Sequence, residues 1–128
     1  MTFTGFLNGE PLAKIYSAAD LFIFPSSTET FGNVVIEALA SGTPVIGAKA
    51  GGVKNIVHHN QHGLLCEPKK ADEFISAIEK LLSNDTLRET FSLNAREFAM
   101  NHSWESVFDR LVEEIEAALA PEAQALLA

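Results

Sequence analysis

The sequence is poor in cysteine and in positive charge. Its one cysteine, Cys66, cannot form a disulfide within the chain, and a cysteine-based zinc site is excluded. A single cysteine is typical of a reducing compartment, so we expect a cytoplasmic protein. The 9 lysines and arginines are outnumbered by 17 acidic residues, which gives a net charge of −8. Nucleic acid, which binds mainly to basic surfaces, is therefore not an expected partner.

Long apolar runs and a signal-type N-terminus are also lacking. No stretch approaches the roughly 20 apolar residues of a membrane-spanning helix. Residues 1–6 have neither the basic region nor the apolar stretch of a signal peptide. We therefore expect no transmembrane segment. The sequence does contain 47% hydrophobic and 20% charged residues in 128 positions, which is typical of one globular domain.

Hydrophobic patterning predicts an α/β fold with a parallel sheet and flanking helices. Four consecutive apolar residues at 21–24 indicate a strand buried on both faces. Gly42 is expected to end the helix that begins near Val34, and Pro121 to end the last helix. The expected strands cover 2–6, 20–25, 44–48 and 62–66, and the expected helices cover 9–19, 34–41, 53–57, 71–82, 86–100 and 104–120.

Glu37 is the only charged residue in an apolar helix. Because residues 34–40 are otherwise apolar, we expect this helix to be buried. A buried carboxylate is costly unless it is hydrogen-bonded. Glu37 therefore either lies on an exposed edge or bonds nearby backbone, or it faces a cleft and accepts hydrogen bonds from a ligand. A pair of sugar hydroxyls would suit it, since a carboxylate can accept from both.

The start of the same helix offers an anion site. The N–H groups of residues 31–34 lie at the positive end of the helix dipole, where a diphosphate binds readily. Alternatively, Gly32 is a turn residue and Asn33 an ordinary N-cap. Glu29, in the polar loop 26–30, is either a solvated carboxylate or a contact for a hydroxyl-rich ligand beside the phosphate site. Ligands of parallel sheets bind beyond the carboxyl ends of the strands, where we expect this loop.

The remaining reactive and aromatic residues favour structural roles. His58, His59 and His62 are expected in a surface loop rather than around a metal, because no Asp or Cys completes a ligand set. Cys66 is expected in the core. Helical spacing predicts core positions for a set of aromatic residues, namely Phe74, Phe91, Phe98, Trp104 and Phe108.

The segment 29–46, with the sequence ETFGNVVIEALASGTPVI, resembles the signature of the family 4 (group 1) glycosyltransferases. That signature has two glutamates, here Glu29 and Glu37, with Phe-Gly after the first and Glu-Ala-x-Ala-x-Gly-x-Pro-Val from the second. The resemblance extends over nearly the whole chain, through residues 3–6, 19–26, 50–53 and 63–65.

This resemblance implies a GT-B fold, in which two Rossmann-like domains face each other across a cleft. The chain would be the incomplete C-terminal domain, which binds a nucleotide-diphosphate sugar. The implied reaction transfers the sugar to a sugar or lipid acceptor with retention and without a metal or other cofactor. Glu37 would hold the ribose hydroxyls, and Glu29, the expected catalytic residue, would contact the donor sugar. The expected donor site comprises Glu29, Thr30, Phe31, Gly32, Asn33, Val34 and Glu37.

The donor class is suggested by two details of the same resemblance. Asn33, together with residues 50–53 downstream, is most similar to enzymes that use GDP-mannose, UDP-glucose or UDP-sulfoquinovose to glycosylate lipids. A lipid acceptor would place the protein at the inner face of a membrane, in loose contact with it.

Family members differ from this sequence in what precedes its first residue. They carry an N-terminal domain there, and two further strands of the C-terminal domain with an Arg and a Lys that clamp the diphosphate. Lys14, Lys49 and Lys54 do not match that motif. We therefore expect residues 1–120 to form a partial domain whose exposed sheet edge invites self-association, and residues 121–128 to form a frayed tail.

Two functions of different classes follow from these expectations. The chain is either the donor-binding half of an active glycosyltransferase or a truncated nucleotide-sugar-binding module without turnover on its own. A sugar epimerase with the same fold fits the pattern of Glu29 and Glu37 less well.

Overall fold

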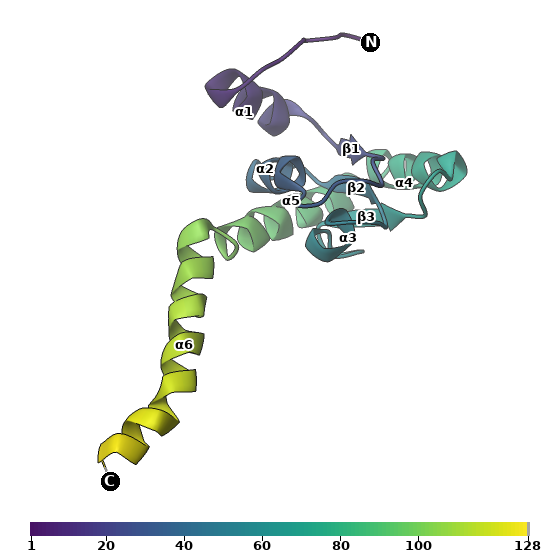
Figure 1. The fold of residues 1–128 in the computed structure, drawn as a ribbon. Coiled ribbons are helices and arrows are strands. Elements are labelled where there is room, and N and C mark those ends of the chain that lie inside the picture. Colours follow the sequence, from purple (N-terminus) through teal and green to yellow (C-terminus); the bar gives the residue numbers. More distant parts are fainter. Residues whose placement is uncertain (128) are drawn as a thin grey trace.

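The computed structural model describes the backbone of residues 1–127 and the side chains of residues 1–120. Its centre is a parallel sheet with the strand order β1-β2-β3, formed by Phe22–Phe24, Val45–Ala48 and Gly63–Cys66 (Figure 1). The expected α/β fold is confirmed. The helices are α1 (Gly9–Ala18), α2 (Asn33–Ala40), α3 (Val53–Ile56), α4 (Ala71–Leu82), α5 (Asp85–Met100) and α6 (Trp104–Leu127).

The central strand β2 determines how the sheet is put together. Val45 aligns with Phe22 of β1 on one side and with Gly63 of β3 on the other. All residues of β2 are buried, which explains why this strand is an uninterrupted apolar run. Because the strands are parallel, α2 and α3 connect them, and all three carboxyl ends lie at one edge of the sheet.

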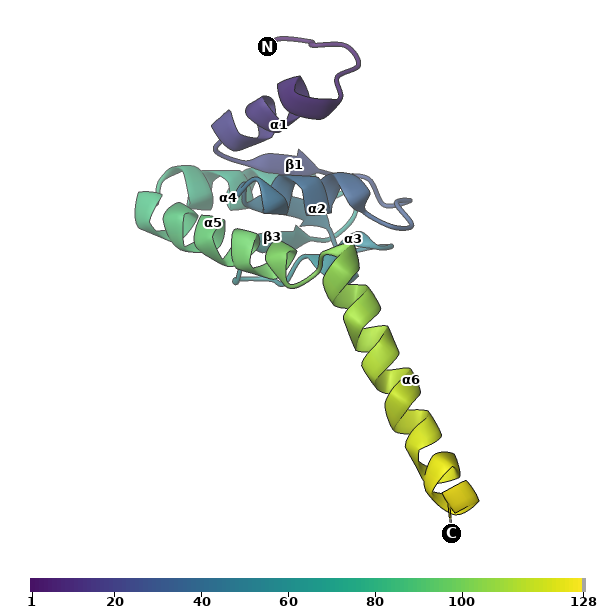
Figure 2. The same cartoon turned by 90° about the vertical axis from the view of Figure 1, so that its left-hand side faces the viewer.

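Side chains alternate across the sheet and build one core on each face. On one face, Ile46 and Leu64 pack with α4 and with Phe91 of α5. On the other face, Val45 packs with α2 and α3, and Figure 2 shows α2 in front of the strands. Cys66 lies in the first core, as expected, and burial followed by the charge of Glu73 raises the pKa of its thiol.

Helix α2 ends at Gly42, as the sequence predicts. Gly42 has a φ of 74°, and its N–H donates to the carbonyl of Leu39 at 2.9 Å. The N–H of Thr43 donates to the carbonyl of Ala38 at 3.0 Å. This pair of bonds is a Schellman motif, which needs the left-handed conformation that glycine adopts without strain. The motif turns the chain sharply from α2 into β2.

Residues 2–6 do not form the expected strand. Phe3 and Phe6 have 86% and 90% of their surface exposed, and Gly5 has a φ of 69°. A strand is stabilised by hydrogen bonds to a neighbouring strand and by burial of one face. The described residues supply neither a neighbouring strand nor a covering face for this segment. The alternation of apolar and polar residues around Phe3 therefore does not correspond to a strand.

Strand β1 is less buried than its apolar run predicts. Ile23 is 43% exposed, and among the residues that the structure describes β1 pairs with β2 alone. The expectation of burial on both faces was therefore wrong: Phe22 and Phe24 pack against the core of α2 and α3, whereas Ile23, on the opposite face, is only partly covered. The exposed edge that the sequence predicts beside residues 21–24 is present.

Helix α6 extends away from the rest of the chain as a long arm (Figures 1 and 2). The core positions expected for Trp104 and Phe108 were wrong, since these side chains are 88% and 64% exposed along the arm. The backbone is helical to Leu127, so the helix end expected at Pro121 was also wrong. A proline removes one hydrogen bond and can bend a helix without ending it. The frayed tail was predicted for residues 121–128, whose side chains are not among those that the structure describes.

The helices that follow the sheet are amphipathic. In α4, Phe74 and Leu81 are buried, whereas Leu82 is 51% exposed. Asn84 caps α5, since its side-chain oxygen accepts a hydrogen bond from the N–H of Leu87 at 3.0 Å. None of the described helices combines the length and the apolar character that a bilayer crossing requires.

The adjacent leucines of α4 provide a test of this packing. Leu81→Ala should lower the free energy of unfolding by about 2–5 kcal/mol, because Leu81 is fully buried and its truncation leaves a cavity. The matched change Leu82→Ala should cost less than about 1 kcal/mol, since half of Leu82 is already in water. Chemical denaturation measures both values, and equal costs would contradict the orientation of α4.

Candidate functional site

Two loops meet at the edge where the strands end. The loop 25–32 follows β1 and leads into α2, and the loop 49–52 follows β2 and leads into α3. The N–H of Gly52 donates to the carbonyl of Glu29 at 2.8 Å and joins the two loops. The residues that the sequence singles out between 29 and 34 therefore lie at the carboxyl edge of the sheet, where parallel sheets bind ligands.

Gly51 and Gly52 let the two loops approach closely. A Cβ on Gly51 would overlap the carbonyl oxygen of Glu29, and a Cβ on Gly52 would overlap that of Thr30. Gly51 also has a φ of 53°, which strains any residue with a side chain. In the sequence, residues 50–53 stood out only through the family resemblance. Two consecutive glycines in the loop after a buried strand were the signal that could have revealed the contact.

The first turn of α2 offers backbone donors. Gly32, rather than Asn33, is its N-cap, with a φ of 67°, and its carbonyl accepts from the N–H groups of Val35 and Ile36 at 3.0 and 3.1 Å. Among the described residues, the N–H groups of Asn33 and Val34 have no hydrogen-bond partner. They lie at the positive end of the helix dipole and are available to an acceptor.

Glu29 places a carboxylate at the same end of the helix. Its side chain is partly buried, and its Oε1 accepts a hydrogen bond from the N–H of Gly32 at 3.1 Å. A carboxylate at a helix N-terminus is electrostatically favourable. The site thus combines an acceptor for hydroxyl groups with adjacent backbone N–H donors for an anion.

Gly32 is held from the side of α3. A Cβ at Gly32 would lie 2.6 Å from Cδ1 of Ile56. Together with its positive φ, this contact makes glycine the residue that fits both the backbone and the packing at the start of α2. The short helix α3 therefore supports the turn that presents the N–H groups.

Glu37 lies further along α2 and is exposed, a position that is compatible with either of the two alternatives. Tyr16 of α1 is its neighbour and stacks edge-on against Phe22 with ring centroids 5.4 Å apart. Burial, and then the adjacent carboxylate of Glu37, raise the pKa of Tyr16. Tyr16 is therefore protonated at neutral pH. Sequence reasoning missed this neighbour because Tyr16 matched an ordinary apolar position of a helix.

The histidines do not join this site. His58 and His59 are exposed, as expected of a surface loop, but His62 is only 2% exposed. The surface position predicted for His62 was wrong because its ring packs against Phe98 of α5, with centroids 4.6 Å apart. Within the described part of the chain, no three acidic, histidine or cysteine side chains converge on a point suited to a metal ion.

Comparison with known proteins gives consistent matches. The family model described as "Glycosyl transferases group 1" matches residues 1–98. Sulfoquinovosyl transferase SQD2 of Arabidopsis thaliana is 35% identical over 115 residues. Sucrose-phosphate synthase from Thermosynechococcus elongatus superimposes with a TM-score of 0.80 at 37% identity. HepE of Anabaena, solved in complex with UDP, superimposes with a TM-score of 0.72 at 29% identity.

The matches cover most of this chain but only part of each relative. They span 88%, 91% and 83% of this chain for the transferase of Arabidopsis, the synthase and HepE. The corresponding shares of those proteins are 22%, 30% and 29%. The chain thus spans less than a third of the length of each of these relatives.

The glycine contact yields a prediction about the loop 25–32. Gly52 has an ordinary φ of −68°, so Gly52→Ala adds only the overlap with Thr30 and no backbone strain. We expect it to lower the free energy of unfolding by about 1–3 kcal/mol and to speed amide exchange at Gly32 and Gly52. Lys49→Ala, an exposed change in the same loop, should alter neither. Unchanged exchange in Gly52→Ala would contradict the close approach.

Proposed function

Because this chain belongs to the group 1 glycosyl transferases, we propose that it binds the donor in an enzyme that transfers a sugar from a nucleotide-diphosphate sugar. One observation carries the proposal: the carboxylate of Glu29 lies beside the backbone N–H groups at the start of α2. The carboxylate accepts hydrogen bonds from sugar hydroxyls, and the N–H groups donate to a diphosphate. A hexose attached to a diphosphate presents both kinds of group side by side.

The proposed roles follow the order of the residues along the loop and helix. The N–H groups of Phe31, Asn33 and Val34 contact the sugar and the diphosphate, and Thr30 lines the same turn. Glu37, exposed on α2, accepts from the two ribose hydroxyls, as the resemblance implies. The hydroxyl of Tyr16 remains protonated beside Glu37 and can donate to one oxygen of its carboxylate.

The chemistry of transfer suits these groups. The bond between the anomeric carbon and the diphosphate oxygen breaks, so positive charge develops on the sugar and negative charge on the leaving diphosphate. Fixed N–H donors at the helix terminus stabilise the negative charge on the leaving diphosphate without having to reorganise. In this proposal, the carboxylate of Glu29 lies next to the positive charge on the sugar. We propose that transfer proceeds with retention and that no metal is required, because backbone donors take up the charge of the leaving group.

The proposed donor is a UDP-hexose, with GDP-mannose as the competing candidate. The similarity to HepE, whose structures are solved with UDP and with UDP-glucose, supports a UDP donor. The proposed acceptor is a sugar or a lipid. A lipid acceptor would bring the protein to the inner surface of a membrane from the cytoplasm.

A second candidate is donor binding without turnover by this chain alone. The side chain of Phe31 is 75% exposed beside the site, and the donor groups lie on an open surface. Such a surface can hold a nucleotide sugar but leaves the anomeric carbon accessible to water. Turnover would then need an element that covers the site and supplies the acceptor.

Calorimetric titration with UDP, GDP, UDP-glucose and GDP-mannose tests the donor site. We expect one nucleotide to bind at least tenfold more tightly than the other. Glu37→Ala should weaken that nucleotide about 10- to 100-fold, since it removes hydrogen bonds to a charged acceptor. Glu79→Ala, an exposed change on α4, should leave affinity unchanged. A folded chain that binds none of these ligands would contradict the proposal.

Glu29→Gln separates recognition of the sugar from recognition of the nucleotide. The change removes the negative charge next to the diphosphate site and weakens acceptance of sugar hydroxyls. We expect the affinity for UDP-glucose to fall about tenfold, while the affinity for UDP stays equal or rises. Equal losses for both ligands would place Glu29 at the nucleotide rather than at the sugar.

Turnover assays on the enzyme in the presence of EDTA test the proposed independence from metal.

A further inference from the structure

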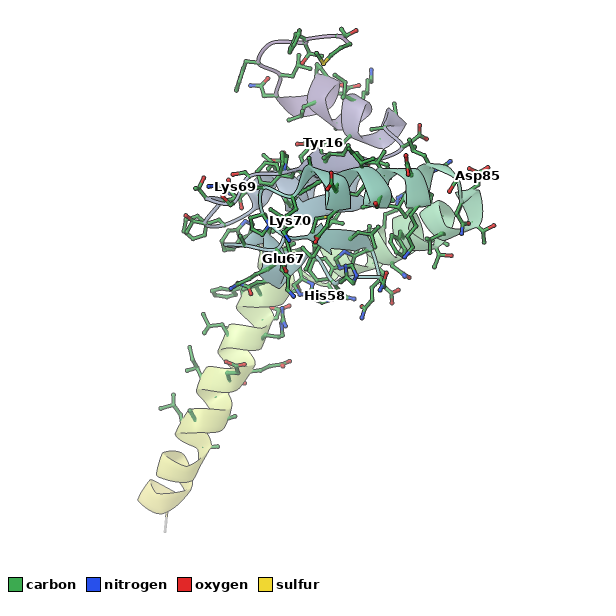
Figure 3. All side chains as sticks on the ribbon, turned by 90° about the vertical axis from the view of Figure 1, so that its right-hand side faces the viewer. Tyr16, His58, Glu67, Lys69, Lys70 and Asp85 are labelled. Carbon is green, nitrogen blue, oxygen red and sulfur yellow. The ribbon has the colours of Figure 1, made fainter. Side chains whose placement is uncertain are left out.

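Four aromatic rings gather where the loop before β3 meets the end of α5. His58 and His62 come from the loop, and Phe98 and His102 from the end of α5 and the turn beyond it. The ring centroids of His58 and His62 lie 5.1 and 4.6 Å from that of Phe98, and His102 stacks on the same ring at 3.9 Å. Figure 3 shows His58 close to the point where α6 leaves the rest of the chain.

His62 is the unusual member of this cluster. It is 2% exposed, and neither of its ring nitrogens has a hydrogen-bond partner among the described residues. A buried neutral imidazole without partners is already unfavourable, and an imidazolium there would bury a full charge. Burial, and then the positive charges of His58 and His102, lower the pKa of His62 to about 4 from its ordinary value of 6.5.

The groups around the cluster do not compensate a charge on His62. The rings line a cavity of about 390 Å³ together with Gln61, Asn94, Glu97 and Asn101. The amide of Asn94 donates to the carbonyl of Gln61 at 2.8 Å, and Nδ1 of His102 lies 2.8 Å from the carbonyl of Phe98. Glu97 is the one carboxylate in this lining, and it is exposed and makes no described bond to His62.

The cluster also joins two parts of the fold. The carbonyl of His62 accepts from the N–H of Val45 at the start of β2, and β3 begins at the next residue. On the other side, α6 begins two residues after His102. We propose that His58, His62, Phe98 and His102 form a pH-sensitive latch between the loop before β3 and the corner of α5 and α6, and that protonation of His62 opens it.

The direction of the pH effect follows from proton binding. The unfolded chain binds a proton at His62 with the ordinary pKa, whereas the folded chain does so only near pH 4. The stability that depends on neutral His62 is therefore complete above pH 6.5 and is lost as the pH falls towards 4. For each unit by which the pH falls in this window, protonation of His62 alone should raise the equilibrium constant for unfolding by up to about tenfold.

Titration of the histidine ring resonances in the 128-residue chain by NMR tests the latch directly and needs no variant. We expect the signal of His62 to reach its midpoint well below the ordinary value of 6.5. In the same range, amide exchange corrected for its intrinsic pH dependence should rise at residues 61–64 and 98–102 together. An ordinary midpoint for His62, or exchange that rises at only one of the two segments, would overturn the proposal.

Substitution of His62 provides a second test of the latch. In His62→Leu, the extra loss of stability between pH 6.5 and 4.5 should disappear, which corresponds to up to about a hundredfold in the unfolding constant. The control His59→Asn changes an exposed imidazole, and its side-chain oxygen can replace Nδ1 as acceptor for the N–H of Leu65. This control should keep the pH dependence. An unchanged pH dependence in His62→Leu would overturn the proposal, and if that variant fails to fold, the NMR titration decides alone.

Discussion

The close contact between two loop backbones is the constraint on which the candidate site depends. Gly51 and Gly52 lie so near the carbonyls of Glu29 and Thr30 that side chains are excluded there. The hydrogen bond from Gly52 to Glu29 fixes the loop after β1 against the loop after β2. Both loops begin at neighbouring parallel strands, so the paired strands and the bond between the loops together position the first turn of α2.

In the proposed donor site, an acidic chain would bind a diphosphate. With a net charge of −8, the protein as a whole repels anions. Backbone N–H groups at a helix terminus attract them locally, and they need no lysine or arginine for this. In the proposed site, Glu29, bonded to Gly32 at the same terminus, would add selectivity, because an acceptor in that place favours ligands that carry hydroxyl groups next to the phosphate.

The sequence predicts the fold well where local chemistry decides it. The buried run of β2, the glycine that ends α2 and the Asn84 cap of α5 each depend on a few neighbouring residues, and each is found in the structure. Predictions that require a partner in space were less successful. Residues 2–6 have the pattern of a strand but no strand beside them, and Trp104 has the spacing of a core residue on a helix that extends away from the core.

The candidate site shows the same division. The resemblance indicated residues 29–34 and Glu37, but the placement of Tyr16 beside Glu37 and the burial of His62 against Phe98 depend on contacts between distant segments. No periodicity in the sequence encodes those contacts. The close approach at the glycine pair was not visible in the sequence, because the partner carbonyls lie some twenty residues earlier in the chain.

The position of the single cysteine has a practical consequence. Cys66 is 3% exposed at the end of β3, packs against α4, and has a thiol whose pKa is raised by burial. A thiol reagent therefore meets a largely covered sulfur, and it should react faster when β3 and α4 separate. The rate at which Cys66 is alkylated in the native chain is therefore a measure of how often this part of the core opens. No label has to be introduced for this measurement.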